Sequence, residues 1–377
     1  MKRIILAGLV LSLLLGGLPA LAEYTDPDDE DLLIEDIIEA PEEEKKEVLD
    51  TDGSSILTIT CTGDLTIGGD SRKRKNIFED ELNAQGGDVS FTMQNMRQIL
   101  MEDDLTLVNF EGTLTESTYI PSSKKNNEFL FSAPPSYVSL LTDNGIEAVS
   151  LENNHVMDHG EEAYAETQQV LEGAGIVWSN SEHIGVFEVK GIQVAMLSYL
   201  CIDRYDELWD RVPAEIAAAK ERYPLVIVSF HWGLEPTRDN PQRGYEPTAN
   251  QIKMGRLAVD AGADLVVGHH SHRANPIELY NGVYICYSLG NFCFAGNSKP
   301  SDMSSIVFQI RFRVKDGVCT SRGFRVIPIR ISSVTSRNDF IPTPYSSGSN
   351  IDSVLSVLKN NGRKLEYAVP EYPLEWR

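Results

Sequence analysis

Six of the seven histidines in this 377-residue chain lie in three short segments, and each segment follows an apolar run. The segments are 153–160, 231–235 and 268–272. Two more apolar runs are followed by acidic residues, Asp64 and Glu111. Imidazoles together with carboxylates suit Zn, Mn, Fe or a similar divalent ion, whereas oxygen ligands alone would suggest Mg or Ca. The sequence therefore predicts a metal centre, most simply one that holds two ions.

Short β-rich runs must position these residues. We expect strands at 55–62, 105–109, 147–151, 193–199, 225–231, 265–268 and 283–288, and helices at 91–101, 135–144, 161–172 and 250–261. Such alternation predicts an α/β sheet covered on both faces, whose sites form beyond the carboxyl ends of the strands. The later runs 305–314 and 323–331 predict an antiparallel pair at a sheet edge.

The segment 153–160 packs several polar side chains between a strand and a helix start, which favours a functional role for Asn154 and His155. Asn153 and Asp158 also fit helix caps, and that alternative stays open.

The sharpest signal is the run of three histidines within four positions after 265–268. Strand alternation predicts that His270 and His272 lie on one side and His269 on the other. After the strand predicted at 225–231, Glu235 is close enough in sequence to His231 to orient its ring without binding the metal itself.

With these residues assembled, the order of motifs resembles that of the poly-γ-glutamate capsule biosynthesis family (CapA-type), a branch of the calcineurin-like metallophosphoesterase superfamily. The likeness runs from about residue 57 to residue 294 and also includes the segment 288–292. It implies an α/β fold, a metallophosphoesterase-like β-sandwich of two mixed sheets flanked by helices, four layers in all. It also implies two divalent ions, Mn, Zn or Fe, bridged by a carboxylate.

The resemblance assigns roles residue by residue. Asp64 and His272 would bind one metal, Glu111 would bridge, and Asn154, His231 and His270 would bind the second. His155 would protonate the leaving group or steady the substrate oxyanion, and Asp158 would be a second catalytic residue. Supporting or substrate-binding positions would be Asn109, Asn153, Glu235, His269 and Asn291. One departure matters: Thr66 stands where ordinary phosphoesterases carry the histidine of Asp-x-His, so one imidazole ligand is missing.

These roles imply metal-assisted hydrolysis of a phosphoester, or of another anionic ester or amide, in cell-surface polymer metabolism of the poly-γ-glutamate type. The alternative is a non-catalytic surface accessory protein for polymer export or attachment, with membrane subunits of a poly-γ-glutamate synthesis complex as partners. A zinc peptidase is disfavoured because the chain has no HExxH, and a dinucleotide-binding fold because no GxGxxG follows the first strand.

The charge of the chain limits its partners. A formal net charge of −23 and a pI near 4.7 argue against nucleic acid, which needs a basic face. The basic run 72–75 is a local exception that could hold a polyanion near the site, with a solvated loop as the alternative.

The ends of the chain differ from its middle. Residues 1–22 resemble a signal peptide, with an uncleaved anchor as the alternative, so we expect an exported protein, extracellular or attached to the cell surface. Residues 23–54 form an acidic linker, which is expected to be disordered unless it forms an acidic amphipathic helix. The metallophosphoesterase-like domain spans 55–335, and 336–377 form a C-terminal loop and a short helix at 351–360.

The five cysteines show no CxxC pair and no disulfide framework. Cys61 and Cys286 lie in apolar runs and are expected to be small buried hydrophobes. One disulfide among the last three cysteines remains open.

Overall fold

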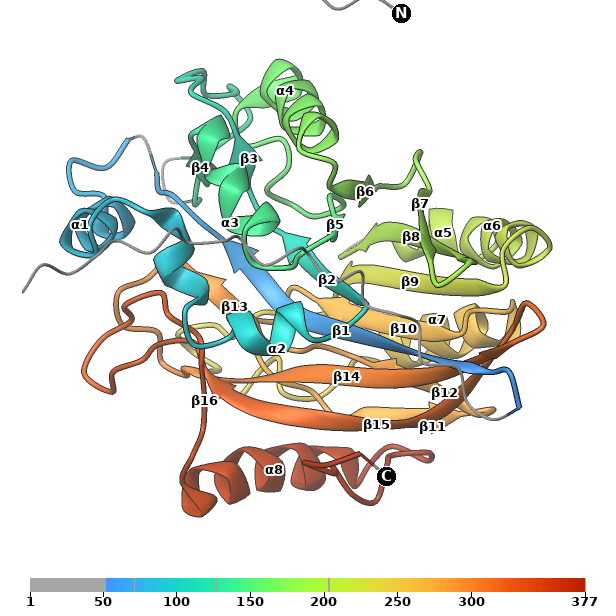
Figure 1. Cartoon of the computed structure of the whole chain (residues 1–377). Helices are drawn as coiled ribbons and strands as arrows, with labels where there is room; N and C mark the ends of the chain where they lie inside the picture. The colour runs from blue at the N-terminus through green and yellow to red at the C-terminus, as the bar shows by residue number, and fades with distance from the viewer. Residues whose placement is uncertain (1–51, 71, 126–127, 203, 377) are drawn as a thin grey trace, which may run out of the picture. The chain divides into compact units, whose positions relative to one another are not determined.

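The computed structural model describes residues 52–70, 72–125, 128–202 and 204–376. The predicted signal peptide and nearly all of the predicted acidic linker therefore lie outside the described residues. The rest of the chain builds two mixed β-sheets (Figure 1).

The first sheet has the strand order β16-β15-β14-β1-β2-β5-β6, and β13 pairs with the end of β1. Its strands are β1 (Ser55–Thr66), β2 (Leu105–Phe110), β5 (Ala148–Ser150), β6 (Val177–Ser179), β13 (Asn291–Phe294), β14 (Ser304–Lys315), β15 (Val318–Arg330) and β16 (Thr343–Pro344). Strands β1, β2, β5 and β6 run parallel, whereas β14, β15 and β16 are antiparallel to their neighbours. The parallel strands bring their carboxyl ends to one edge.

The second sheet has the order β11-β12-β10-β9-β8-β7. Its strands are β7 (Gly185–Val189), β8 (Ile192–Cys201), β9 (Leu225–Trp232), β10 (Leu265–His269), β11 (Ile277–Tyr280) and β12 (Val283–Cys286). The central strands β8, β9, β10 and β12 are parallel. A two-stranded ribbon joins β3 (Thr113–Leu114) to β4 (Ser132–Ala133).

Side-chain alternation along the strands produces three core layers. Along β9, Leu225 and Ile227 face the other sheet, while Val226 and Val228 face helices. Those helices are α5 (Tyr205–Leu208), α6 (Arg211–Lys220) and α7 (Ala249–Asp260). Strands at the centre of the sheets, such as β2, β9 and β10, are buried along their whole length because both of their faces are covered.

The first sheet is covered on its outer face in the same way (Figure 1). Its helices are α1 (Ile77–Ala84), α2 (Arg97–Met101), α3 (Ser139–Thr142) and α4 (Gly160–Gly173), with 3-10 turns at Val89–Met93 and Pro135–Val138. The layers are thus helix, sheet, sheet and helix, and the predicted fold class is confirmed.

Helix α8 (Gly348–Gly362) lies along β15, and its Val354 and Leu358 join the core between the sheets (Figure 1). It is longer than the predicted helix 351–360. The predicted C-terminal loop that precedes this helix packs on the domain. Phe340 and Ile341 are buried, and Ser332 donates to Asp339 Oδ1 at 2.8 Å.

Several elements differ from their predicted bounds. The predicted helices 91–101 and 135–144 each combine a 3-10 turn with a short α-helix. The antiparallel pair β14 and β15 is confirmed, although only β15 lies near the sheet edge, since β14 pairs with β1. All five cysteines are free, and Cys61 and Cys286 are buried between the sheets as predicted. Within the described part of the chain, no helix is long and apolar enough to cross a bilayer.

Candidate metal centre

The ends of the strands bring the predicted ligands together from both sheets. Asp64 in β1 is paired with Asn109 of β2 on one side and with Asn291 of β13 on the other. In the second sheet, His231 at the end of β9 is paired with His269 at the end of β10. Residues separated by more than 200 positions thus share one edge.

Three side chains form the first candidate ligand set. Asp64, Glu111 and His272 each offer an atom, and these atoms lie within 4.8 Å of one another. Nδ1 of His272 is 3.1 Å from Oδ2 of Asp64. Both carboxylates are buried, and among the described residues Asp64 Oδ2 and both oxygens of Glu111 have no hydrogen-bond partner. Buried carboxylate oxygens are costly without a partner, and a cation would supply one.

A second set of side chains lies on another side of Glu111. Nε2 of His231 is 2.7 Å from Oδ1 of Asn154 and 3.1 Å from Nδ1 of His270. The same nitrogen is 3.8 Å from Oε1 of Glu111. Two imidazole nitrogens and an amide oxygen therefore lie close together, and Nε2 of His231 also faces Glu111. These are the donors that the resemblance implies for a second divalent ion.

The pKa values of Glu111 and Asp64 are shifted in opposite directions. Burial raises the pKa of Glu111, and the neighbouring charge of Asp64 raises it further. Burial also opposes ionisation of Asp64, but the neighbouring imidazoles of His269 and His272 outweigh it and lower the pKa of Asp64. Two neighbouring buried carboxylates repel each other when both are ionised, and a bound cation would remove this repulsion.

The pKa values of the neighbouring histidines are also shifted in opposite directions. Burial lowers the pKa of His231, and it lowers the pKa of His270 to about 4. For His272 burial acts in the same direction, but the carboxylates of Glu111 and Asp64 overcome it and raise the pKa to about 10. A neutral imidazole keeps one nitrogen lone pair, which a metal ligand needs, so the lowered pKa values of His231 and His270 favour metal binding. The residues present therefore fit divalent ions.

His155 lies beside the cluster and is held by Asp158. Its Nδ1 is 2.8 Å from Oδ2 of Asp158, and its Nε2 is 3.8 Å from Oε1 of Glu111. Oδ2 of Asp158 also accepts a hydrogen bond from the Phe131 amide at 2.7 Å. The cap alternative for Asp158 is wrong, because α4 begins after His159 without a side-chain cap and the Asp158 carboxylate binds elsewhere.

The predicted supporting residues form an amide network behind the ligands. Asn109 donates to Oδ1 of Asp64 at 2.8 Å, and Asn153 donates to Oδ1 of Asn109 at 3.2 Å. Oδ1 of Asn153 in turn accepts a bond from the backbone amide of His155 at 3.0 Å. On the other side, Oδ1 of Asn291 is 2.9 Å from Nδ1 of His272. Such contacts orient ligands and fix their protonation.

Two predicted details are wrong. Glu235 does not contact His231; its Oε1 is 3.6 Å from Nδ1 of His270 and 4.0 Å from Nε2 of His272. His269 does not point away from the site, since its Nδ1 is 3.4 Å from Oδ1 of Asp64. The alternation argument fails here because β10 ends at His269, and His270 and His272 have the positive φ values 90° and 53°.

Two contacts were not predicted. Lys124 forms an ion pair with Asp158, and the ring of Phe131 lies 4.6 Å from that of His155. Neither residue belongs to a motif, and only the fold brings Lys124 and Phe131 against the segment 153–160. No signal in the sequence could have identified these partners.

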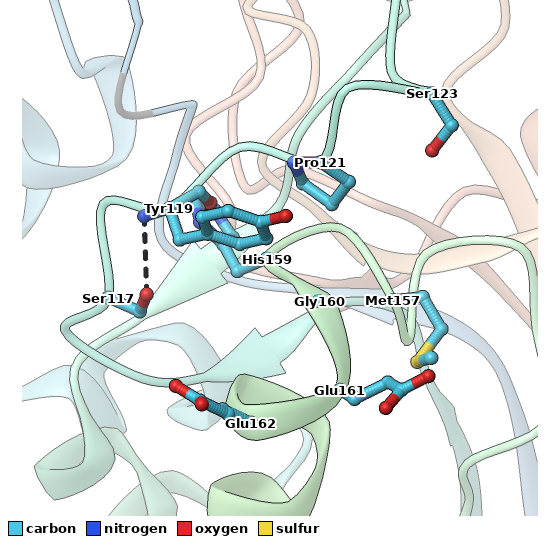
Figure 2. Close-up of a pocket in the computed structure, with 9 residues that line it drawn as sticks. All are labelled: Ser117, Tyr119, Pro121, Ser123, Met157, His159, Gly160, Glu161 and Glu162. Carbon is cyan, nitrogen blue, oxygen red and sulfur yellow. Dashed lines mark hydrogen bonds between the residues drawn. The ribbon is translucent and has the colours of Figure 1, made fainter.

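A cavity of about 680 Å³ lies near the start of α4 and is lined by none of the candidate ligands. Figure 2 shows Tyr119, His159 and Met157 around it. Nδ1 of His159 is 2.9 Å from the carbonyl oxygen of Tyr119, so this imidazole belongs to the loop rather than to the metal centre.

The fold and the cluster together define a two-sheet α/β protein with a candidate dinuclear metal centre at the strand ends. A family model of bacterial capsule synthesis proteins (PGA_cap) matches residues 58–296. The chain belongs to this family. The predicted CapA-type resemblance is thereby confirmed.

Named relatives agree with the family. The chain is 29% identical over 306 residues to the PGA biosynthesis protein CapA of Bacillus subtilis, a match that covers 76% of this chain and 74% of that protein. It is 27% identical over 281 residues to the capsule biosynthesis protein CapA of Bacillus anthracis, covering 68% of this chain and 64% of that protein.

Among solved structures, the calcineurin-like phosphoesterase YfkN from Bacillus subtilis aligns with 82% of this chain and 100% of that chain. The identity is 16% and the TM-score 0.44. The assignment of the fold rests on the sheets and cores described above.

Proposed function

We propose that this protein is an exported, metal-dependent hydrolase that cleaves an anionic ester or amide in cell-surface polymer metabolism of the poly-γ-glutamate type. One observation carries the proposal. The buried carboxylates of Asp64 and Glu111 have oxygens without hydrogen-bond partners among the described residues, and they face His231, His270 and His272. Such an arrangement is costly for the fold unless cations bind there.

When bound, divalent ions would make a water more acidic and withdraw charge from the attacked group. The chain's own part is positioning and proton transfer. Asp158 holds Nδ1 of His155, so Nε2 is the nitrogen on the side of Glu111 that can pass a proton to a leaving oxygen or nitrogen. Hydrogen bonds from Asn109 and Asn153 hold the Asp64 side chain and the His155 backbone in position.

The substrate class is supported by the relatives, whose names concern capsule and PGA biosynthesis. Export is supported by the sequence of residues 1–22 alone, with its positive start, apolar run and small-residue cleavage site.

The proposal is tested with purified protein loaded with Mn or Zn. Turnover is measured on a chromogenic phosphodiester and on a γ-glutamyl anilide, for the wild type and for His155→Ala. We expect turnover in the wild type and a loss of about 100-fold or more in the variant. His183→Ala is the matched control, because this histidine stacks on Trp178 outside the site and its loss should leave turnover unchanged. Equal turnover in His155→Ala and the wild type would contradict the assignment.

A second function, a non-catalytic accessory role in polymer export or attachment, is favoured by Thr66. Its hydroxyl is buried without a hydrogen-bond partner in the described structure, and no imidazole stands at that position. A site with fewer imidazole ligands could hold metal and polymer without turning over. Stoichiometric metal binding combined with no turnover on either substrate would select this role.

A further inference from the structure

The basic run 72–75 consists of one residue that is held in the structure, Arg72, and three exposed residues. Arg72 donates to both oxygens of Asp70, at 2.9 and 2.7 Å, and to the carbonyl of Lys125 at 3.1 Å. Its guanidinium therefore ties two loops together and neutralises Asp70. Lys73, Arg74 and Lys75 are exposed. Three cations thus remain at the surface of a strongly acidic chain.

Lys73 and Lys75 border a cavity of about 220 Å³ that lies between the residues just before α1 and the segment 295–298. Its lining includes Lys73, Lys75, Asn76, Phe131, Asn297 and Ser298. The acidic side chain in this lining, Asp70, is paired with Arg72. We call this cavity the basic groove.

The basic groove adjoins the candidate metal centre through two aromatic rings. Phe131 lines the groove and also lies 4.6 Å from the ring of His155. The ring of Phe294 lies 5.2 Å from that of His272 and 6.2 Å from that of Phe131. Gly296, in the groove lining, is so close to both phenyl rings that a Cβ atom would meet them at 2.7 and 3.0 Å. The ring of Phe131 therefore lies between the basic groove and His155.

Both walls of the groove are held in place. Asn338 is buried, and its side chain donates to the carbonyls of Phe294 at 2.7 Å and Asn297 at 3.1 Å. Nζ of Lys73 lies 4.8 Å from the ring centroid of Phe129, which stacks on Phe131. A ligand entering here would meet a formed surface, which reduces the ordering cost of binding.

The lysines of the groove are available for a ligand. Lys75 has an ion pair with Asp80 at 3.4 Å, with the two side chains 74% and 58% exposed, and such pairs are weak and easily exchanged. A chain with a formal charge of −23 repels polyanions as a whole, so a polyanion needs a local cationic surface to approach.

We propose that the basic groove binds an anionic stretch of polymer that extends from the candidate metal centre, with Lys73 and Lys75 pairing with its carboxylates or phosphates. This rests on the proposed function for the place of the reacting bond, but the binding itself needs no turnover. The groove is thus a substrate-binding subsite for a repeating anion rather than for a small neutral ester.

The test measures binding by fluorescence polarisation with two labelled probes, a ten-residue glutamate oligomer and a polyphosphate of equal charge. We expect wild-type affinity that falls as salt rises, and an affinity about tenfold weaker in the double variant Lys73→Ala/Lys75→Ala. The control Lys359→Ala/Lys364→Ala removes the same charge from exposed lysines elsewhere and should bind like the wild type. Lys73→Arg/Lys75→Arg should restore binding.

The outcomes separate this proposal from the hydrolase. Salt-sensitive binding that depends on the two groove lysines supports the groove even if no ester is cleaved, and a preference between the probes identifies the anion. Equal affinities of the groove variant and the control variant would overturn the groove, whatever the turnover assay shows.

Discussion

Replacing Glu111 by glutamine tests the metal centre most directly, because it removes a charge and changes little else. Both oxygens of Glu111 are buried without a hydrogen-bond partner in the described residues, and burial raises its pKa. Without metal, the protein therefore carries an uncompensated carboxyl group. A neutral amide relieves that cost, so we expect metal-free Glu111→Gln to be more stable than the metal-free wild type by about 1–3 kcal/mol.

Metal should stabilise the wild type much more than the variant. A ligand at one hundred times its dissociation constant stabilises the folded state by about 2.7 kcal/mol, so the wild type should gain roughly 5 °C in melting temperature at ~2 °C per kcal/mol. Glu111→Gln lacks the bridging charge and should gain little. The assay is thermal unfolding of both proteins in EDTA and then with Mn or Zn.

Glu278→Gln is the matched control. Glu278 is as buried as Glu111, but Arg256 donates to its Oε1 at 2.6 Å and Tyr287 to its Oε2 at 2.6 Å. The same substitution should therefore lower the melting temperature and leave the metal-dependent rise intact. If Glu111→Gln keeps the full rise with metal, or is less stable than the wild type in EDTA, the reasoning about the cluster is refuted.

Three further predictions follow from other parts of the structure. Asp158→Asn should lower turnover about 100-fold by releasing His155, yet leave the metal-dependent rise in melting temperature unchanged; loss of that rise would indicate a structural role instead. Gly268→Ala should lower the free energy of unfolding by about 3 kcal/mol in denaturant unfolding, because a Cβ would lie 2.1 Å from the Tyr287 carbonyl oxygen. Gly173→Ala is the control: this glycine has open space around it, so the substitution should be neutral or slightly stabilising. Equal effects of the two substitutions would contradict this reasoning. Burial raises the pKa of Asp103 to about 7. The folded state therefore holds an extra proton between about pH 4 and 7, and it loses stability as pH rises through this range. Asp103→Asn should remove this decline, and parallel profiles of melting temperature against pH for the wild type and the variant would refute the prediction.

Local patterns were sufficient for much of this architecture. The continuous apolar run from Leu225 to Val228 indicated a buried strand, and the helix predicted at 250–261 corresponds to α7. Short elements escaped prediction. β13 has four residues and is recognisable only by its pairing with β1, and the three-residue β6 only by its pairing with β5. Their stability comes from neighbours that are distant in sequence.

The sequence by itself determined the ligand types, their order and their placement at strand ends, because buried strands and the polar residues that follow them are recognisable from hydrophobic pattern alone. Only the tertiary structure decided which atoms face one another. It turned His269 toward Asp64, Glu235 toward His270, and Asp158 toward His155. The physical reason is that these contacts form after the strands end, where backbone dihedral angles no longer follow the strand period and the packing of the two sheets sets the direction of each side chain.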